Sequence, residues 1–519
     1  MSNLLNAMKK ENNFTYTENG AVTRRSTNNS LLDLFGMGAS YRTRSEEDCI
    51  LLFKKAFDED PTYAMKCLFY IGDIRGGQGE RRFFRVVSKW LANNHTEVMR
   101  RNLKYIPEYR RWDDLYTFVG TKLENEAFAL MASQIALDLQ CKTPSLLAKW
   151  LKSENTSSAE SRALANKTRA AFELNHRQYR KMLSYLRAKI NVVERLMSAG
   201  KWDEIEFDKI PSKAGLIYRN AFARHDIERM KSEKNVVSYE NFMKDDTTKV
   251  NAKALYPYEV VAKAYNYSRE HLARNCNWST RRYEEPKGNL DDVERLAINK
   301  YWDNLKDYFN GCSLDALCVV DTSGSMTGSE ASAPINVAIS LGLYAAERAR
   351  GPFAGHYVSF SSRPQLIETV GVDFVDKVRR IYQTNLCENT NIEATFDMIL
   401  NTAIRNRCKQ SDLPKSIVVI SDMEFDTARG YYYGGRRPQD HVTLMENIER
   451  KWQQAGYQMP NLVFWNVQAR QDNIPMTVKD GISFVSGFSP VLFEQIMKGK
   501  TAFDLMMDKL NDERYEVIK

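Results

Sequence analysis

The chain has 519 residues and a formal net charge of +8, with 43% hydrophobic and 27% charged residues. This length exceeds what one compact core accommodates, so two or more domains are expected. No stretch approaches an apolar transmembrane helix, and the polar residues 1–29 lack the apolar segment of a signal peptide. We therefore expect a cytoplasmic monomer without a membrane partner.

The distribution of charge indicates the kind of partner, and the cysteines indicate the redox compartment. Residues 312–519 carry 22 basic and 25 acidic side chains, whereas the preceding part has a net charge of +11. A basic excess of this kind favours nucleic acid or another anionic surface as a partner, although solvated basic faces are also common in helical proteins. The eight cysteines form no Cys-x-x-Cys pair and are expected to be free thiols in a reducing compartment.

The first two predicted segments differ in pattern. Residues 1–30 are rich in Asn, Thr and Ser and predict a flexible N-terminal arm with no assigned fold. Residues 31–310 have helical periodicity, as in the stripe Phe83, Val86, Val87, Trp90 and Leu91. Many medium-length helices between short turns indicate an α-solenoid or an irregular helical array.

A glycine-rich turn at residues 73–82 is the strongest binding signal in the helical region, because backbone can approach a phosphate there and basic residues flank it. Trp112, beside two arginines, could stack a base or pack at a core edge. The RNA-binding candidates are Arg75, Gln78, Arg81, Arg82, Arg85, Arg110, Arg111 and Lys149. The alternative is a helix–helix turn whose arginines pair with Asp73, Glu80 or Asp113.

From residue 311 the pattern changes. Strand-like runs alternate with helical patterns and predict a doubly wound α/β domain over residues 311–500, followed by a C-terminal helix at 501–519. The predicted strands are 314–320, 356–360, 416–421, 462–467 and 482–485.

Polar oxygen-bearing side chains follow these strands. Asp321, Ser323 and Ser325 come directly after the first strand, Thr390 precedes a predicted helix, and Asp422 ends the strand 416–421. Loops at the carboxyl ends of parallel strands converge, so these groups are expected to meet. Oxygen ligands of low total charge suit Mg²⁺ or another divalent cation, with a position left for an outside ligand.

This order and spacing resemble the metal-ion-dependent adhesion site of von Willebrand factor A domains. The resemblance implies direct coordination by Ser323 and Ser325, water-mediated binding by Asp321 and Asp422, and state-dependent coordination by Thr390. Many members of that family have a glycine before the threonine, where this chain has Asn389.

A second resemblance covers nearly the whole chain after residue 30. The stretches 71–84, 106–115, 145–157, 191–203 and 486–490 are similar to uncharacterised bacterial, phage and viral proteins related to the Ro ribonucleoproteins. That family joins a HEAT-like helical array, the TROVE domain, to a von Willebrand factor A domain. The resemblance implies a helical ring that binds small noncoding RNA on its basic outer surface and takes single-stranded ends of misfolded RNA into its hole.

These observations leave three functional hypotheses. The first is a noncatalytic RNA-binding protein whose metal-site domain binds a partner or closes the ring. The second is an interaction adaptor that captures a partner carboxylate at the metal. The third is a Mg²⁺-dependent nuclease that uses Asp422, Glu424 and Asp426.

Overall fold

The computed structural model describes most of the chain. The described residues are 13–190, 192–231, 236–265, 276–277, 282–283, 290–309, 315–328, 330–360, 363–384, 390–426, 442–476, 479–496 and 501–519, with Leu4 and Met8. Several residues within the predicted segments, among them Asn191, Leu314 and Asn389, lie outside them. The chain divides into two compact units, one comprising residues 1–67 and 255–512 and the other residues 68–254 and 513–519.

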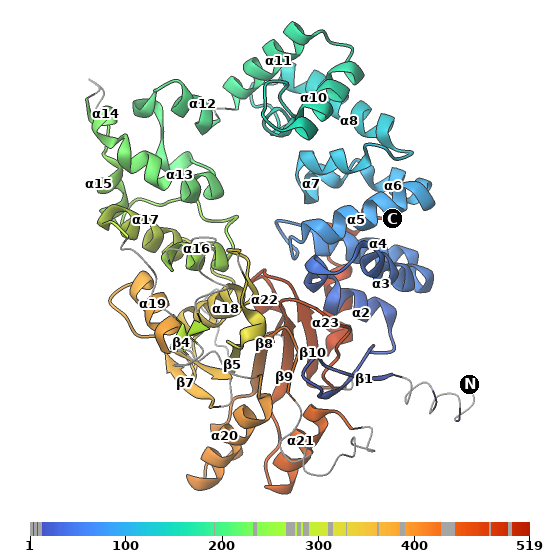
Figure 1. Ribbon diagram of the computed structural model, residues 1–519, viewed down its shortest axis with the longest axis vertical. Helices are drawn as coiled ribbons and strands as arrows, with labels where there is room; N and C mark the ends of the chain where they lie inside the picture. The colour runs from blue at the N-terminus through green and yellow to red at the C-terminus, as the bar shows by residue number, and fades with distance from the viewer. Residues whose placement is uncertain are drawn as a thin grey trace. The chain divides into compact units, whose positions relative to one another are not determined.

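The first unit contains a six-stranded sheet (Figure 1). Its strands are β5 (Ala316–Asp321), β6 (His356–Phe360), β7 (Gln365–Glu368), β8 (Ser416–Ser421), β9 (Asn461–Asn466) and β10 (Ile482–Ser486). The order is β10-β9-β8-β5-β6-β7, and every neighbouring pair is parallel except β6 and β7. This sheet confirms the predicted α/β class. The antiparallel edge strand β7 was not predicted, because three of its four side chains are exposed and it forms no apolar run.

Strand β5 lies between β8 and β6, and all six of its residues are buried. Helix α18 (Pro334–Arg348) packs against it at very close range. A Cβ atom on Gly342 of this helix would lie 2.5 Å from Cγ2 of Val320, so only glycine allows the observed approach. The strand that carries Asp321 is therefore fixed by neighbours in the sheet and by a helix above it.

Further helices surround this sheet or extend from it within the first unit. They are α2 (Ser30–Met37), α3 (Glu46–Glu59), α16 (Pro257–Ala264), α17 (Asp292–Asp303), α19 (Phe374–Thr384), α20 (Ile392–Arg405), α21 (Leu444–Gln454), α22 (Leu492–Ile496) and α23 (Ala502–Leu510). Helix α2 packs on β10, where a Cβ atom on Gly36 would lie 3.3 Å from that of Phe484. The first unit therefore combines sheet strands with helices from both ends of the chain.

Part of the predicted flexible arm is folded. Strands β1 (Phe14–Tyr16) and β2 (Val22–Arg24) form an antiparallel hairpin, and α2 begins at Ser30. The hairpin has little apolar content, but it makes hydrogen bonds to the first unit, including both backbone bonds between Arg24 and Ile474. A short pair, β3 (Cys276–Asn277) and β4 (Arg282–Tyr283), is also antiparallel.

The second unit is helical, which confirms the predicted class of the earlier region. Helix α4 (Pro61–Gly72) leads into it. Its other helices are α5 (Arg81–Asn94), α6 (Thr96–Leu103), α7 (Ile106–Tyr109), α8 (Glu124–Gln140), α9 (Leu147–Trp150), α10 (Ala159–Ala171), α11 (His176–Lys189), α12 (Val193–Ser198), α13 (Ser212–Arg224), α14 (Asp226–Met230) and α15 (Tyr239–Lys244). The last residues of the chain belong to this unit, since Arg514 and Tyr515 both donate hydrogen bonds to the buried carboxylate of Asp73.

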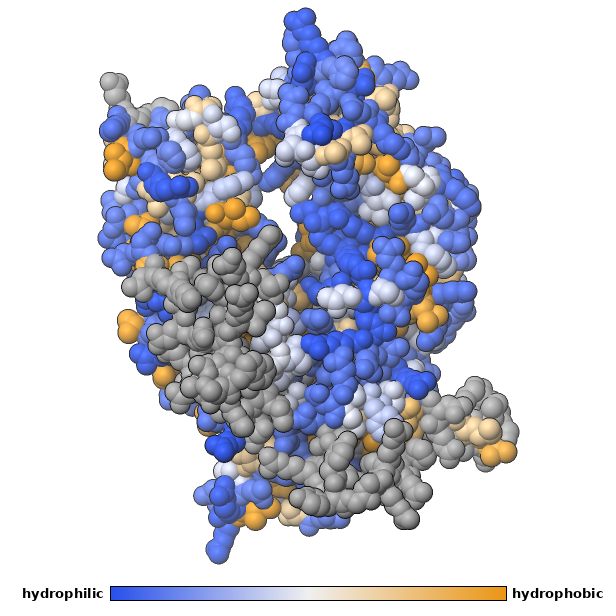
Figure 2. All heavy atoms as spheres, in the orientation of Figure 1, coloured by the Kyte–Doolittle hydropathy of each residue, from blue (hydrophilic) through white to orange (hydrophobic). Residues whose placement is uncertain are grey.

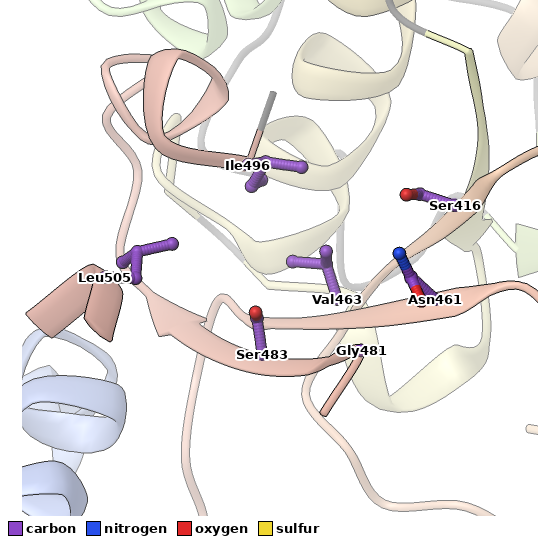
Figure 3. A pocket seen from close by; sticks show the side chains of 7 residues that line it. All are labelled: Ser416, Asn461, Val463, Gly481, Ser483, Ile496 and Leu505. Carbon is purple, nitrogen blue, oxygen red and sulfur yellow. The ribbon is translucent and has the colours of Figure 1, made fainter. Parts of the chain in front are cut away.

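Among the described residues, no helix has the length and apolar character needed to cross a bilayer. A small cavity lies at the amino ends of β8, β9 and β10, beside Ser416, Asn461 and Gly481 (Figure 3). Its volume of about 10 Å³ is at the limit for a single water molecule. It also lies at the end of the sheet opposite to Asp321, so it does not belong to the predicted metal site.

The contact between α18 and β5 can be tested by overpacking. Gly342→Val places a branched side chain where even one carbon meets Val320, so we expect the free energy of unfolding to fall by about 1–3 kcal/mol. Urea unfolding measures this change. The exposed control Ala331→Val should stay within about 0.5 kcal/mol of the unsubstituted chain. Equal stabilities of the two variants would contradict this packing.

Candidate functional site

The loop after β5 gathers the first three predicted metal ligands. The Ser323 amide donates a hydrogen bond of 2.9 Å to Oδ1 of Asp321, which turns the chain directly after the strand. The Oγ atoms of Ser323 and Ser325 then lie 2.9 Å apart. Asp321 and Ser323 are almost completely buried. The Asp-x-Ser-x-Ser spacing thus places one carboxylate and two hydroxyls in a single turn.

Strand β8 brings the second carboxylate to the same edge of the sheet. It pairs in parallel with β5, and Ile420 lies opposite Val320 in the register. Ser421 donates a hydrogen bond of 2.6 Å to Oδ2 of Asp321, so the ends of the two strands are joined directly. Asp422 follows, buried, and its Oδ1 accepts a hydrogen bond of 3.2 Å from the Glu424 amide.

Thr390 reaches this edge from the start of α20. It is buried, and its carbonyl accepts a hydrogen bond of 2.9 Å from the Asp426 amide, which ties the Thr390 loop to the segment after Asp422. The side chain of Asn391 caps α20 by accepting from the Ala394 amide. The loop position of Thr390 is therefore fixed by the helix cap and by the segment after β8.

Burial disfavours the ionised form of both carboxylates in this cluster. Burial raises the pKa of Asp321, and the Asp422 carboxylate raises it further. Burial also raises the pKa of Asp422, although the Arg470 guanidinium opposes this effect. Nε of Arg470 lies 3.7 Å from Oδ2 of Asp422. Two buried like charges are stabilised most directly by a positive ion between them.

The donor set fits a hard divalent cation. Its side-chain oxygens belong to Asp321, Ser323, Ser325, Thr390 and Asp422. Within the described ranges, no three His, Cys, Asp or Glu side chains gather in a metal-binding cluster. The donor set combines two carboxylates with three hydroxyls. That chemistry suits Mg²⁺ better than a softer metal.

Two of the acidic residues proposed for a nuclease contact the N-terminal hairpin, Glu424 through its carboxylate and Asp426 through its backbone. Glu424 is buried, which raises its pKa to about 7, and its Oε1 accepts a hydrogen bond of 2.7 Å from Asn473. Its Oε2 accepts one of 2.6 Å from the Glu18 amide. Asp426 forms an isolated β-bridge with Gly20. These contacts give Glu424 and Asp426 roles in holding the N-terminal hairpin.

The glycine-rich turn of the helical unit is built around Arg110. This side chain is buried, and its Nη1 donates to the carbonyls of Gly72 and Glu80. Its Nε bonds Oδ2 of Asp114 at 3.1 Å. Gln78 is also buried. Arg110 and Gln78 therefore support the turn in this conformation and present no accessible surface to an RNA.

The neighbouring arginines pair with two carboxylates. Arg81 lies 3.2 Å from both Asp113 and Asp114, Arg85 lies 2.6 Å from Asp114, and Arg111 lies 2.8 Å from Asp113. This matches the structural alternative considered from the sequence. The arginine side chains stay about a third exposed, so they keep a partly accessible positive face.

The other sequence candidates lie nearer the surface. Arg75 is exposed, and its Nη1 donates to the carbonyl of Glu108. Arg82 and Lys149 are half-buried. The Arg111 guanidinium lies 3.9 Å from the centre of the Trp150 ring, and the Lys149 ammonium lies 5.8 Å from it. Lys149, Arg111 and Trp150 thus form one basic and aromatic cluster.

Helix α11 carries a basic surface whose residues were not among the RNA-binding candidates predicted from the sequence. Residues 142–189 contain eleven Lys and Arg side chains against three Glu. Arg177, Arg180, Lys181 and Tyr185 of α11 are exposed, and Lys189 lies 4.7 Å from the Tyr185 ring. Figure 2 shows the surface over α10 and α11, at the top of the view, as mostly hydrophilic. The scarcity of acidic residues across this segment is the feature of the sequence from which the basic surface could have been predicted.

The α11 surface is connected to the Trp150 cluster. Arg187 of α11 donates hydrogen bonds of 2.9 Å to the Ala148 carbonyl and 2.8 Å to the Leu151 carbonyl. A third bond, of 2.9 Å, reaches Oγ of Ser153. Helix α9, which carries Lys149 and Trp150, is therefore held against the basic helix.

Comparisons with known proteins add the following matches. A family model described as "Domain of unknown function (DUF2828)" matches residues 17–145 and 128–310, and one described as "Domain of unknown function (DUF7788)" matches residues 315–517. "Uncharacterized protein L728" of Acanthamoeba polyphaga mimivirus is 28% identical over 530 residues, which cover 94% of this chain and 85% of that protein. The crystal structure of the Deinococcus radiodurans RO (RSR) protein aligns with a TM-score of 0.39 and 13% identity, over 94% of this chain and 100% of that one.

Loss of one carboxylate tests the metal site. At a free Mg²⁺ concentration about a hundred times the Kd, binding should stabilise the fold by about 2.7 kcal/mol, and Asp321→Asn should abolish this gain. Thermal unfolding with and without MgCl₂ measures it. Asp315→Asn, at the opposite end of β5, is the control that should retain the gain. A Mg²⁺ response that survives in Asp321→Asn would contradict the assignment.

The arginine–aspartate network predicts a pH dependence. Burial opposes ionisation of Asp114, but Arg110, Arg81 and Arg85 outweigh it and lower the pKa from 3.8 to about 2. The folded state therefore holds this carboxylate ionised more strongly than the unfolded state does. Its contribution, about 2 kcal/mol, is present above pH 4 and is lost as the pH falls toward 2.

Urea unfolding of the unsubstituted chain and of Asp114→Asn should show this contribution. The variant should be the less stable protein at pH 5, and the difference should shrink as the solution is acidified. A difference that stays constant between pH 5 and pH 2 would mean that ionised Asp114 does not stabilise the helical unit.

Proposed function

This chain belongs to the family described as "Domain of unknown function (DUF2828)", and from its own residues we propose that it is a noncatalytic RNA-binding protein. RNA is held on the helical unit, and the α/β unit carries a divalent-cation site. The observation that carries the proposal is the exposed basic surface of α11 with its accessible tyrosine.

The α11 surface has the chemistry that single-stranded RNA requires. Arg177, Lys181, Tyr185 and Lys189 follow one another at intervals of four residues, which places them along one side of a helix. Lys and Arg neutralise backbone phosphates without regard to sequence. An exposed Tyr ring offers a face on which an unpaired base stacks. Basic groups and an aromatic ring thus lie together on one accessible helix.

The Trp150 cluster extends this surface. Lys149 lies beside the Trp150 ring on α9, and Arg187 ties α9 to α11. Arg111 also lies over this ring but is paired with Asp113. Two aromatic side chains with basic neighbours form a track rather than one isolated contact. The sequence resemblance to Ro proteins independently implies RNA as the partner class, which agrees with this surface.

The cation site is assigned a binding role. The carboxylates and hydroxyls of Asp321, Ser323, Ser325, Thr390 and Asp422 would hold Mg²⁺, and the bound cation would offer a coordination position to one further oxygen ligand. A second cation for nuclease chemistry would need Glu424, whose two carboxylate oxygens accept bonds from Asn473 and Glu18. These contacts favour a noncatalytic protein.

The RNA proposal is tested by removing charge from α11. The triple variant Arg177→Gln, Arg180→Gln, Lys181→Gln should bind fluorescein-labelled single-stranded RNA about tenfold more weakly at moderate salt. It should also reduce the slope of log Kd against log salt by about 2, since each phosphate contact contributes about 0.7. Fluorescence anisotropy across a KCl series measures both quantities.

The matched control removes three exposed basic side chains from the other unit. Lys54→Gln, Lys55→Gln, Arg405→Gln changes the net charge by the same amount and should leave the affinity and its salt slope nearly unchanged. Equal losses in the two triple variants would mean that net charge, and not the α11 surface, governs binding. No binding to the unsubstituted chain at low salt would overturn the proposed function.

A further inference from the structure

The turn of the N-terminal hairpin lies at the edge of the cation site. Residues Thr17–Gly20 connect β1 and β2, and the Gly20 amide donates to the Thr17 carbonyl at 3.0 Å. Gly20 has a φ of 87°, a conformation that favours glycine. This turn presents Glu18 and Asn19 at its tip.

The hairpin turn bonds the segment that follows Asp422. Oγ1 of Thr17 donates to the Phe425 carbonyl at 2.6 Å, and Nδ2 of Asn19 donates to the Glu424 carbonyl at 2.6 Å. Nδ2 of Asn19 also lies 3.4 Å from Oγ1 of Thr390, one of the proposed ligands. The turn therefore contacts a cation-site residue directly.

Arg470 connects Glu18 to two other site residues. Its Nη1 donates a hydrogen bond of 3.1 Å to Oε2 of Glu18, and its Nε lies 3.7 Å from Oδ2 of Asp422. Its Nη2 donates to the Ser325 carbonyl. One guanidinium thus contacts Glu18, Asp422 and the serine loop, so Glu18 and the site residues share a common neighbour.

The base of the hairpin is anchored, while the Glu18 side chain keeps freedom to move. Oγ1 of Thr23 donates to the Ile474 carbonyl at 2.8 Å, and Arg24 lies 3.2 Å from Glu446. These bonds fix the strands behind the turn. The Glu18 side chain is 40% exposed, and the side chain of its partner Arg470 is 31% exposed. A change of partner at Glu18 therefore requires side-chain rotation and no unfolding.

We propose that Glu18 is an intramolecular ligand of the cation site. This inference rests on the proposed cation site. Two buried carboxylates and neutral hydroxyls leave room in the coordination sphere of a hard cation, and Glu18 is the acid that the fold delivers to that edge. A bound cation would repel the Arg470 guanidinium that now holds Glu18 and would attract the carboxylate in its place. Glu18 thereby fills the position that a partner's carboxylate takes in an adhesion-type site.

The hairpin then controls access from outside. An acidic partner must displace Glu18 and lift the turn from Phe425 and Glu424 before it reaches the cation. RNA binding on α11 does not depend on this exchange, because α11 belongs to the other unit. The two binding activities are separable by substitution.

The test measures Mn²⁺ binding by isothermal titration calorimetry, using the full chain freed of metal with a chelator. Glu18→Gln should raise the Kd for Mn²⁺ about tenfold, since affinity at such sites follows the number of charged ligands. Glu18→Asp should also weaken binding severalfold, because a carboxylate one methylene shorter does not reach the same position. Glu47→Gln, an exposed acid on α3, is the control and should bind as the unsubstituted chain does.

A second readout is thermal unfolding with metal. Mn²⁺ should raise the melting temperature of the unsubstituted chain more than that of Glu18→Gln, because the variant binds the ion more weakly. Thermal unfolding without metal confirms that each variant is folded.

The possible results distinguish failure of the Glu18 inference from failure of the proposed cation site. Mn²⁺ binding by Glu18→Gln that equals that of the unsubstituted chain overturns the inference and leaves the cation site standing. A Glu18→Asp variant that binds normally while Glu18→Gln is weak shows a long-range charge effect and also overturns it. An unsubstituted chain that takes up no Mn²⁺ overturns both the inference and the cation site, whereas RNA binding is judged by its own titration.

Discussion

The parallel pairing of β5 with β8, closed by the hydrogen bond from Ser421 to Asp321, is the interaction on which the site of the α/β unit depends. Asp321 and Asp422 follow β5 and β8, whose register brings their ends together. Both groups are buried, and burial with mutual repulsion disfavours their ionisation. Arg470 places positive charge at this edge, with its Nε 3.7 Å from Oδ2 of Asp422. The serine loop, Thr390 and the hairpin turn all converge on the same point.

The charged residues of the helical unit fall into two groups, one that is paired within the protein and one that is exposed on α11. Arg110 is buried and satisfies backbone carbonyls, and its arginine neighbours share the carboxylates of Asp113 and Asp114. These groups hold the turn between helices. On α11, by contrast, Arg177 and Lys181 extend from a helix with no acidic side chain of its own. Accessible charge of this kind can exchange counterions for RNA phosphates, whereas paired charge cannot do so without first breaking its ion pairs.

A feature could be predicted from the sequence when the contacts that create it join residues that are close together in the chain. The strand–loop pattern around Asp321 and Asp422 was readable because an apolar run and the turn that follows it are local signals. The hairpin was missed although Asn19-Gly20, between the alternating residues 14–17 and 21–24, is a local hairpin signal. Its docking could not be predicted, because its bonds reach residues some four hundred positions away. The burial of Arg110 was equally hidden, since a basic residue in a turn has the same sequence signature whether it is exposed or enclosed. The α11 surface had a compositional signal, but no motif marks it.

Photocrosslinking tests the central claim, RNA binding on α11, most directly. Single-stranded RNA containing 4-thiouridine is irradiated in complex with the full chain, and the crosslinked peptides are identified by mass spectrometry. Crosslinks are expected at Tyr185 in α11 and at Trp150 in α9, because these rings offer stacking faces beside basic groups. Crosslinks confined to the α/β unit, with none in residues 142–189, would contradict this claim.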